Sequence, residues 1–240
     1  MNPTILNQQQ HHILFDSDSL SQIVPQWFTP EYWQSRARLQ TVSAGRGRAW
    51  FIEDDAQSMV LRHYQRGGAL AGLLGDKYLW PGLSNTRAWR EWRLLAELFA
   101  QGLPVPQPLA AHVLHNGLFY RADLLTRTIA DSQSLSVRLQ QQPLQASMWR
   151  AIGKLIRRFH LAGVYHADLN AHNILLDKAQ AIYLIDFDKG KIMRPTADTS
   201  SWQQANLQRL QRSLNKLYAQ QSSFEYTESD WDALMHGYRA

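Results

Sequence analysis

The chain has 240 residues, of which 45% are hydrophobic and 19% charged, and it carries a formal net charge of +5 and no cysteine. A chain of this size can bury a substantial core, either as one domain or as one compact two-lobed unit. The lack of cysteine excludes a disulfide framework and favours a reducing compartment. No apolar run is long enough for a transmembrane helix, and the N-terminal residues lack the basic start and apolar core expected of a signal peptide.

The positive charge and the nine Trp residues favour an anionic partner. Arginine side chains match the geometry of phosphate and carboxylate groups, and basic surfaces that contain Trp are typical of proteins that meet membranes. The composition therefore indicates a membrane face or a phosphorylated substrate, although scattered solvated arginines account for the charge equally well. No dedicated nucleic-acid motif is present, so nucleic acid is not an expected partner.

The first part of the chain predicts strands around a glycine turn. Residues 1–40 mix Gln, His, Asp and Pro with apolar positions, which favours an irregular leader with a short helix behind Thr29 and Pro30. Residues 41–52 predict a strand, a turn that contains Gly45 and Gly47, and a second strand. Glycines let backbone N–H groups approach phosphates, so the turn is a candidate nucleotide loop, while a plain hairpin explains the same pattern.

Residues 58–64 alternate as a strand does, which places Val60, Arg62 and Tyr64 on one face. In the following helix Glu91 lies on the same stripe as apolar residues. A carboxylate on an apolar stripe needs a buried partner, and Arg62 is the natural candidate. We therefore expect an ion pair between Arg62 and Glu91. Glu97 is expected on a solvated face of the same helix.

The limits of that helix follow from Asn85, a candidate N-cap, and Gly102, which is typical of the position just past a C-terminus. Before it, residues 67–82 form a glycine-rich, apolar connection that ends in Tyr78-Leu79-Trp80. This connection either covers the core or meets a membrane or an acceptor. After the helix, residues 103–120 predict two strand-like pieces and residues 121–128 a hinge between lobes. Helical spacing of apolar residues then predicts a core helix that ends at Gly163.

The most informative stretch is residues 165–189, YHADLNAHNILLDKAQAIYLIDFDK, in which polar residues flank two apolar runs. The runs at 174–176 and 182–185 predict a short hairpin, with Asp168, Asn173 and Asp186 collected at one end. Carboxylate and amide oxygens are ligands that Mg²⁺ prefers, and a further Asp is available as a base. Phosphoryl transfer from a nucleotide needs these parts. Each residue alone could be a turn former, and His166 is expected to hydrogen-bond the loop backbone rather than to act in catalysis.

The order H-x-D-x-x-x-x-N followed by D-F-x resembles the catalytic and metal loops of the protein-kinase-like fold. The resemblance implies an α+β, two-lobed fold, with a β-rich N-lobe over residues 1–122 and a short, mostly helical C-lobe over 123–240. Arg62 stands where the V-A-I-K pattern of kinases has the phosphate-binding lysine. After Asp186 only two helices are predicted, one around Leu207–Leu217 and one that ends the chain with Ser229 as its cap, too few for a full protein kinase.

The segments YHADLNAHNILLD with LIDFDKG, LRHYQRGG with LLGDKYLW, and REWRLL with GLPVPQPLA resemble the lipopolysaccharide-core kinase family. The likeness runs from about Ser43 to Lys191. It implies transfer of the ATP γ-phosphate to the 4-hydroxyl of 3-deoxy-D-manno-octulosonic acid (Kdo) on a lipid A precursor. It also implies peripheral attachment to the cytoplasmic face of the cell inner membrane, with the lipid-linked Kdo acceptor and the membrane surface as partners.

The resemblance assigns a role to each candidate residue. Asp168 is the catalytic base, and Asn173 and Asp186 are ligands of Mg²⁺. ATP is bound by a set of residues spread along the chain, namely Gly45, Gly47, Val60, Arg62, Glu91 and Leu175. Asn170 stands where related kinases often have Lys or Ser, and no role follows for it. The oligomeric state does not follow from the sequence.

Three other functions fit the same motifs. A small atypical protein kinase also has a short C-lobe, but its metal loop usually reads D-F-G, whereas this one reads Asp186-Phe-Asp188. An aminoglycoside-type phosphotransferase is a second possibility. A non-catalytic nucleotide-binding scaffold is a third, which Arg62 favours and the intact Asp168, Asn173 and Asp186 oppose.

Overall fold

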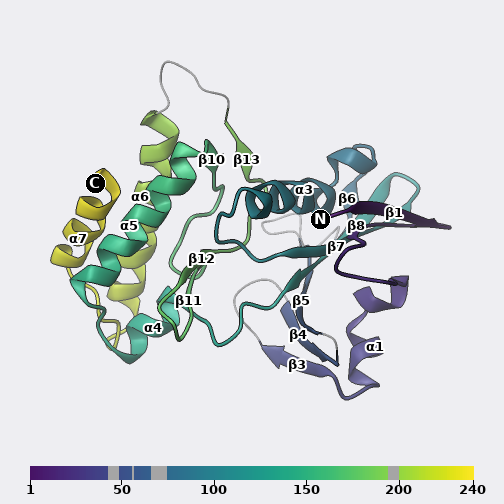
Figure 1. Ribbon diagram of the computed structural model, residues 1–240, viewed down its shortest axis with the longest axis horizontal. Helices are drawn as coiled ribbons and strands as arrows, with labels where there is room; N and C mark the ends of the chain where they lie inside the picture. The colour runs from purple at the N-terminus through teal and green to yellow at the C-terminus, as the bar shows by residue number, and fades with distance from the viewer. Residues whose placement is uncertain (43–48, 56, 66–74, 194–199) are drawn as a thin grey trace. The chain divides into compact units, whose positions relative to one another are not determined.

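The structure is a computed structural model that describes residues 1–42, 49–55, 57–65, 75–193 and 200–240 (Figure 1). By its internal contacts the chain forms two units. Unit 1 comprises Met1–Gln101 and Pro106–Thr128, and unit 2 comprises Gly102–Val105 and Ile129–Ala240. Gly45 and Gly47, the candidate nucleotide loop, lie outside the described residues, as does the first half of the connection over 67–82.

Unit 1 is built on an antiparallel sheet with the strand order β1-β2-β7-β8-β5-β4-β3, and β6 pairs with β8 beside this path. The strands are β1 (Pro3–Gln8), β2 (His11–Asp16), β3 (Leu39–Val42), β4 (Ala49–Asp54), β5 (Gln57–His63), β6 (Tyr78–Leu79), β7 (Pro108–Asn116) and β8 (Phe119–Arg127). Three strand predictions are confirmed. β3 and β4 lie on the two sides of the glycine turn, β5 covers most of residues 58–64, and β7 contains Val113. Most of the predicted hinge, residues 121–127, continues β8.

The irregular leader expected over residues 1–40 is wrong, because β1 and β2 form a hairpin that joins the sheet through β7. The short helix behind Thr29 and Pro30 is present as α1 (Pro30–Gln34). β1 is an edge strand whose residues are mostly exposed, so it lacks a strong apolar alternation. Its turn contains Gln9 with φ 54° instead of a glycine, so the usual turn signal is missing as well.

The two faces of β5 serve different purposes. Met59 and Leu61 are fully buried in a core that also includes Ile52 and, from the N-terminal segment, Phe28 and Trp33. The alternate residues of a strand point to the opposite face. There Arg62 meets Glu91 of α3 (Arg87–Ala100). The strand thus has one face in the core and the other towards a helix.

Helix α3 begins one residue later than predicted. Its N-cap is Thr86, while Asn85 ends a short 3₁₀ helix, η2 (Leu83–Asn85), so the prediction of Asn85 as the cap is wrong. Gly102 follows the C-cap with φ 69°, as its position predicted. The inward face buries three leucines, two tryptophans and Glu91, whereas Glu97 is exposed as expected.

Unit 2 is mostly helical and carries its strands in short pieces. Its helices are α4 (Leu135–Gln141), α5 (Ala146–Leu161), α6 (Ser200–Gln220) and α7 (Glu228–Arg239). Its strands are β9 (Gln133–Ser134), β10 (Val164–Tyr165), β11 (Ile174–Leu176), β12 (Ile182–Leu184) and β13 (Lys191–Ile192). The predicted α5, α6, α7 and β11–β12 hairpin are confirmed, and α4 was not predicted. The cap of α7 is Thr227, which forms a capping box with Asp230, so the assignment to Ser229 is wrong.

Two glycines bring α5 and α7 into backbone contact. A Cβ built on Gly153 would lie 2.0 Å from the carbonyl oxygen of Leu234, and one on Gly237 would lie 2.1 Å from that of Arg150. No side chain fits at either position without separating the helices. The β-rich unit followed by a mostly helical one confirms the predicted α+β fold class. Within the described ranges, no helix is both long and apolar enough to span a bilayer.

Candidate functional site

The β11–β12 hairpin brings Asn173 next to the metal-loop candidate Asp186. Ile174 pairs with Leu184 in the antiparallel register. One step further out, the Ile185 N–H donates to the Asn173 carbonyl oxygen at 3.0 Å. Because Asp186 follows Ile185 directly, its backbone is fixed beside Asn173. The prediction that apolar strands collect these polar residues at one end of the hairpin is confirmed.

Hydrogen bonds hold the backbone of Asp168 on both sides. Its N–H donates to Nδ1 of His166 at 3.1 Å. Its carbonyl oxygen accepts from Nδ2 of Asn173 at 2.9 Å and from Nδ2 of Asn170 at 3.1 Å. Asp168 itself is exposed. The backbone is thus fixed while the residue remains open to solvent, which suits a group that must reach a substrate hydroxyl.

His166 is a structural residue, as predicted. It is 2% exposed, and its Nε2–H donates to the Ile185 carbonyl oxygen at 2.9 Å while Nδ1 accepts from Asp168. These two bonds require the neutral ring with the proton on Nε2. Burial lowers the pKa of His166, which keeps the ring neutral. One imidazole therefore joins the loop of Asp168 to the segment that carries Asp186.

A buried asparagine of α6, which was not among the predicted site residues, holds this histidine by two hydrogen bonds. Asn206 has no exposed surface; its Oδ1 accepts from the His166 N–H at 3.2 Å and its Nδ2 donates to the His166 carbonyl oxygen at 2.9 Å. The signal was available, because Asn206 directly precedes Leu207 on the buried stripe of α6. A polar residue on such a stripe needs buried partners.

The first turn of α4 also contacts the loop that contains Asp168. The Ser136 N–H donates to the Ala171 carbonyl oxygen at 3.0 Å, and its hydroxyl lies 2.7 Å from Nδ1 of His172. Asn170 also accepts from the His172 N–H at 2.8 Å. Asn170, for which no role was predicted, therefore has a positioning role inside the loop.

The metal-loop candidate has a distinctive backbone. Asp186 has φ 62°, in the left-handed region that Asp and Asn tolerate better than most residues. The next residue, Phe187, is fully buried and stacks on Phe159 with ring centroids 5.9 Å apart. Its ring also lies 4.7 Å from that of His166. Burial of Phe187 thus anchors the segment from which Asp186 projects.

The residues present fit a magnesium ion. Asn173 is 8% exposed and uses its Nδ2 to bond Asp168, which leaves Oδ1 as the acceptor atom of its side chain. Asp186 adds a carboxylate from the adjoining segment. One carboxylate and one amide oxygen form a suitable donor set for Mg²⁺, which commonly keeps waters and substrate phosphates as its other ligands.

The predicted ion pair of unit 1 is confirmed. Nη2 of Arg62 contacts Oε2 of Glu91, which is 3% exposed. Tyr64 joins the pair, since its hydroxyl donates to the same carboxylate oxygen at 2.5 Å and lies 3.2 Å from Nη2 of Arg62. The alternation of β5 had placed Tyr64 on this face without revealing its partner.

The structure also describes Val60 and Leu175, two further residues assigned to the nucleotide. Val60 is half-buried on the same face of β5 as Arg62, opposite Thr126 of β8. Leu175 is half-buried in β11 of unit 2. Unit 1 thus brings Arg62 and Glu91 together, and unit 2 brings Asp168, Asn173 and Asp186 together.

Comparison with known proteins identifies close relatives. A 3-deoxy-D-manno-octulosonic acid kinase of Vibrio vulnificus (strain YJ016) is 40% identical over 231 residues, which cover 96% of each chain. Kinases of the same name from Xanthomonas axonopodis pv. citri (strain 306) and Stenotrophomonas maltophilia (strain R551-3) are 44% identical over 226 residues, which cover 94% of this chain and 88% of theirs. Residues 30–238 match the family described as lipopolysaccharide kinase (Kdo/WaaP).

This match covers most of the chain, and the relatives align with it over nearly their full length. Both findings agree with the H-x-D-x-x-x-x-N and D-F-x motifs and with the two-unit α+β architecture. The chain therefore belongs to the lipopolysaccharide kinase (Kdo/WaaP) family and is an ATP-dependent phosphotransferase.

Proposed function

We propose that this enzyme transfers the γ-phosphoryl group of ATP to the 4-hydroxyl of Kdo on a lipid A precursor. The observation that carries the proposal is the arrangement in unit 2, where the Asn173 side chain donates to the Asp168 carbonyl oxygen and the Asn173 carbonyl oxygen accepts from Ile185, the residue before Asp186. The names of the relatives supply the sugar. The lipid carrier and the choice of hydroxyl come from the resemblance to lipopolysaccharide-core kinases.

Asp168 is the proposed general base. Its carboxylate would accept the proton of the sugar hydroxyl as that oxygen attacks the γ-phosphorus. A positioned base contributes about 10²–10⁴ in rate. The bonds from His166, Asn170 and Asn173 to the backbone of Asp168 fix the base before the acceptor arrives.

Asn173 and Asp186 are the proposed holders of Mg²⁺. A magnesium ion held by these residues would supply neutralisation of the charge that develops on the transferred phosphoryl group. The hydrogen bond between Ile185 and Asn173 fixes the spacing of the two ligand-bearing segments. The buried Phe187 anchors the segment that carries Asp186, whose own backbone is left-handed.

Arg62 is the proposed phosphate anchor in place of the usual strand lysine. Glu91 and Tyr64 hold one side of its guanidinium. A guanidinium has five N–H donors, so Arg62 can keep this partner and still donate to a phosphate. The family resemblance adds Val60, Leu175 and the glycines Gly45 and Gly47 to the nucleotide site.

The proposed acceptor is anchored in a bilayer, so we propose that the enzyme works as a peripheral protein at the cytoplasmic face of the cell inner membrane. Its excess of basic over acidic residues suits a surface that carries anionic lipids.

A test of the proposal compares three acceptors under one set of conditions. Purified enzyme is incubated with radiolabelled ATP, Mg²⁺ and either a detergent-dispersed Kdo–lipid A precursor, a mixture of proteins or an aminoglycoside. We expect label only in the Kdo lipid, one phosphate per molecule, with phosphorus–proton NMR correlation placing it on the 4-hydroxyl. The Asp168→Ala variant is the control for contaminating kinases. Label in protein or aminoglycoside alone would reject the proposed acceptor, and a phosphate on another hydroxyl would reject the position.

A further inference from the structure

The outward face of α5 carries an unusual concentration of positive charge. The helix sequence ASMWRAIGKLIRRFHL contains Arg150, Lys154, Arg157 and Arg158 and no acidic residue. At 100° per residue these four side chains and Leu161 fall within an arc of about 100°. Leu161 is 70% exposed. We call these five residues the α5 face.

Helix stability explains only part of this charge. Cations near the C-terminus interact favourably with the helix dipole. Arg158 also donates to the Gly102 carbonyl oxygen at 2.7 Å, and Arg157 lies over the ring of Tyr238. Arg150 and Lys154 are further from that end, and like charges four residues apart repel each other. Over the described ranges, none of these four cations forms an ion pair with a carboxylate. Among the described residues, therefore, no carboxylate compensates the charge on the α5 face.

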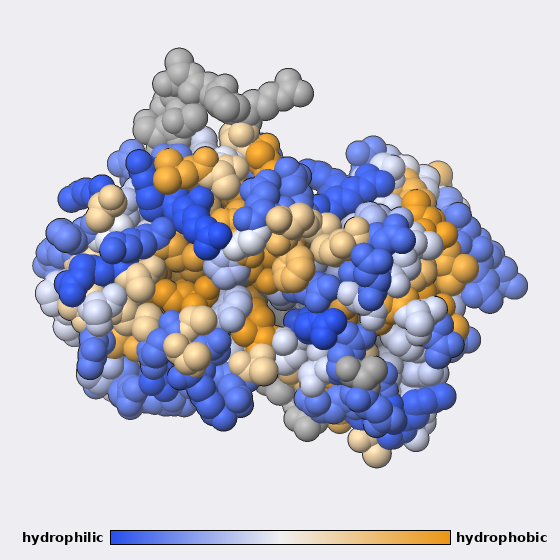
Figure 2. Space-filling view, in the orientation of Figure 1, coloured by the Kyte–Doolittle hydropathy of each residue, from blue (hydrophilic) through white to orange (hydrophobic). Residues whose placement is uncertain are grey.

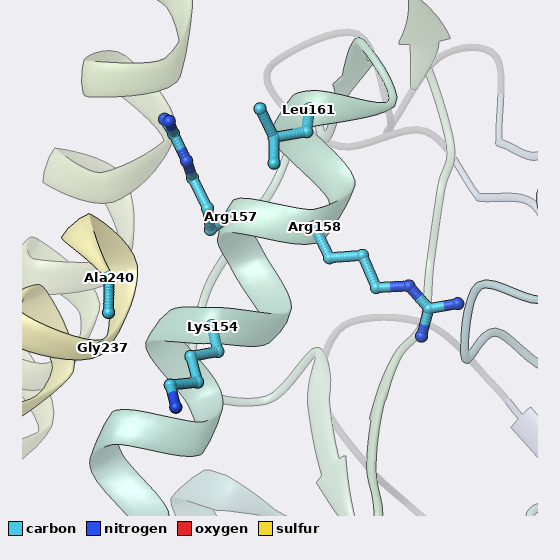
Figure 3. A pocket seen from close by; sticks show the side chains of 6 residues that line it. All are labelled: Lys154, Arg157, Arg158, Leu161, Gly237 and Ala240. Carbon is cyan, nitrogen blue, oxygen red and sulfur yellow. The ribbon is translucent and has the colours of Figure 1, made fainter.

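The α5 face borders a hollow large enough for a small anionic group. The hollow has a volume of about 300 Å³ and is lined by Lys154, Arg157, Arg158, Leu161, Gly237 and Ala240. Figure 3 shows Lys154 and Arg157 on the side of α5 towards α7, while Arg158 extends to the other side. In the space-filling view, hydrophilic residues cover much of unit 2 over α5–α7, with separate apolar patches between them (Figure 2).

A second exposed apolar residue lies beside the end of α5. Ile192 of β13 is 37% exposed, and a Cβ on Gly163 would lie 3.6 Å from its Cγ2. The Met193 N–H donates to the Gly163 carbonyl oxygen at 2.8 Å, which joins the two segments, and β10 and β13 run side by side there (Figure 1). Lys191, also exposed, adds another cation. β13 follows the metal-loop candidate in the chain, so this surface adjoins the proposed catalytic segment.

We propose that the α5 face, together with Ile192, is the surface by which the enzyme docks on a bilayer that contains anionic phospholipids. The cations would contact lipid phosphates, and Leu161 and Ile192 would enter the interface. Uncompensated positive charge beside exposed apolar side chains is the combination that favours an anionic lipid surface over a neutral one. The inference rests on the proposed function, in which the acceptor is lipid-linked.

Unit 1 offers one competing surface. Leu118 is 76% exposed and Leu79 64%, and the Trp80 N–H donates to the Leu118 carbonyl oxygen at 2.9 Å, so these residues form an apolar tip. Its neighbouring cation Arg121 already pairs with Asp76 at 2.9 Å. The tip thus has exposed apolar surface, but an ion pair neutralises part of its positive charge. The α5 face is therefore the better candidate for docking on anionic lipid.

The chain provides a matched pair of charge reversals. Arg150→Glu with Lys154→Glu changes an exposed Arg and Lys four residues apart on α5. Arg212→Glu with Lys216→Glu makes the same change on α6, where both residues are also exposed. Leu161→Ser and Leu118→Ser form a second pair that tests the apolar contribution of the α5 face and of the tip. Thermal unfolding checks that each variant is folded.

Binding is measured by co-sedimentation with vesicles of phosphatidylcholine alone or with about one third phosphatidylglycerol. The unaltered enzyme should bind the anionic vesicles in a salt-dependent manner and the neutral ones weakly. Each basic residue near such a surface contributes about a fivefold gain in affinity, so the α5 double reversal should weaken binding at least about twentyfold. The α6 reversal should stay within about threefold of the unaltered enzyme. Leu161→Ser should weaken binding more than Leu118→Ser.

Equal losses for the two double reversals would overturn the α5 face as a specific docking surface. A larger loss for Leu118→Ser than for Leu161→Ser would assign the surface to unit 1 instead. Binding is measured without ATP or acceptor, so these results do not depend on the proposed reaction. Phosphorylation of the detergent-dispersed Kdo lipid by the unaltered enzyme tests the proposed function separately.

Discussion

The two parts of the candidate site are positioned in different ways. In unit 2, hydrogen bonds to the backbone place Asp168, Asn173 and the segment of Asp186. In unit 1, a side-chain ion pair places Arg62 against the buried Glu91. A side chain whose backbone is held can be removed with little effect on folding, whereas removal of one partner of a buried pair leaves a charge unpaired. Loss of function and loss of stability should therefore separate at Asp168, which is exposed, and coincide at Arg62.

The largest effect is expected from Asp168→Ala. If the carboxylate is the base, kcat should fall by about 10²–10⁴, because proton transfer belongs to the transition state. The melting temperature and the affinity for ATP should change little, because His166, Asn170 and Asn173 bond the backbone of this residue. Steady-state kinetics, thermal unfolding and fluorescent-nucleotide binding measure the three quantities. A variant with more than half of the original kcat would reject Asp168 as the base.

Replacement of Arg62 should affect function and stability together. Arg62→Ala removes the cation that contacts the buried Glu91 carboxylate, so we expect a loss of about 2–3 kcal/mol in the free energy of unfolding. The KM for ATP should rise and kcat should fall, and Arg62→Lys should restore part of each. Urea unfolding and steady-state kinetics measure these changes.

A double-mutant cycle with Glu91→Gln tests the pairing itself. The combined loss of stability should be smaller than the sum of the single losses by about 2 kcal/mol. Arg93→Ala with Glu97→Gln is the matched control, since these residues are exposed on the same helix and should couple by no more than about 0.5 kcal/mol. Additive losses at Arg62 and Glu91 would show that the pair does not act as a unit.

Asn206→Leu should destabilise unit 2, since it leaves the N–H and carbonyl groups of His166 buried without this partner. Each unsatisfied group costs about 1–3 kcal/mol, so we expect a loss of about 2–4 kcal/mol. Asn215→Leu on the exposed side of α6 is the control and should change stability by less than about 0.5 kcal/mol. Urea unfolding compares the two, and equal losses would argue against this role of Asn206.

A smaller effect is expected from the pH dependence of unit 2. Burial lowers the pKa of His160 from 6.5 to about 4, and its neighbours are Tyr238, Asn206, Arg157 and His166. Between those pH values the unfolded chain binds a proton at His160 that the folded chain does not. The free energy of unfolding should therefore fall as the pH decreases from about 6.5 to 4, and this residue should contribute no pH dependence above that window.

The non-titrating variant His160→Gln isolates this contribution. Urea unfolding at pH 7 and at pH 4.5 should show a smaller difference for the variant than for the unaltered protein, by about 1–3 kcal/mol. An identical pH dependence in both proteins would show that His160 does not remain neutral in the folded state.

The sequence predicted best where chemistry and local pattern coincide. Asp168, Asn173 and Asp186 lie within one short stretch, and the apolar runs between them determine the hairpin register that brings Asn173 and Asp186 together. The Arg62–Glu91 pair followed from strand alternation and from a carboxylate on an apolar stripe. Both are local signals that need no knowledge of the rest of the fold.

The sequence predicted least where long-range contacts decide the structure. Gly102–Val105 belongs to unit 2, although the residues before and after it in the chain belong to unit 1. One contact that joins this segment to unit 2 is the hydrogen bond from the Leu184 N–H to the Pro104 carbonyl oxygen at 3.1 Å. The β1–β2 hairpin lacks a turn signal, and the short helix α4 is stabilised partly by the bond between Ser136 and Ala171. No local pattern specifies these partners.

The most direct test of the account is the Mg²⁺ dependence of phosphoryl transfer. The rate is measured against Mg²⁺ concentration at fixed ATP and Kdo lipid for the unaltered enzyme and for Asn173→Ala and Asp186→Asn. If these two residues hold the ion, each variant should need more Mg²⁺ to reach half of its own maximal rate, and Asp186→Asn should show the larger shift because it loses a charge. Variants that reach half-maximal rate at the same Mg²⁺ concentration as the unaltered enzyme would contradict the assignment of this site.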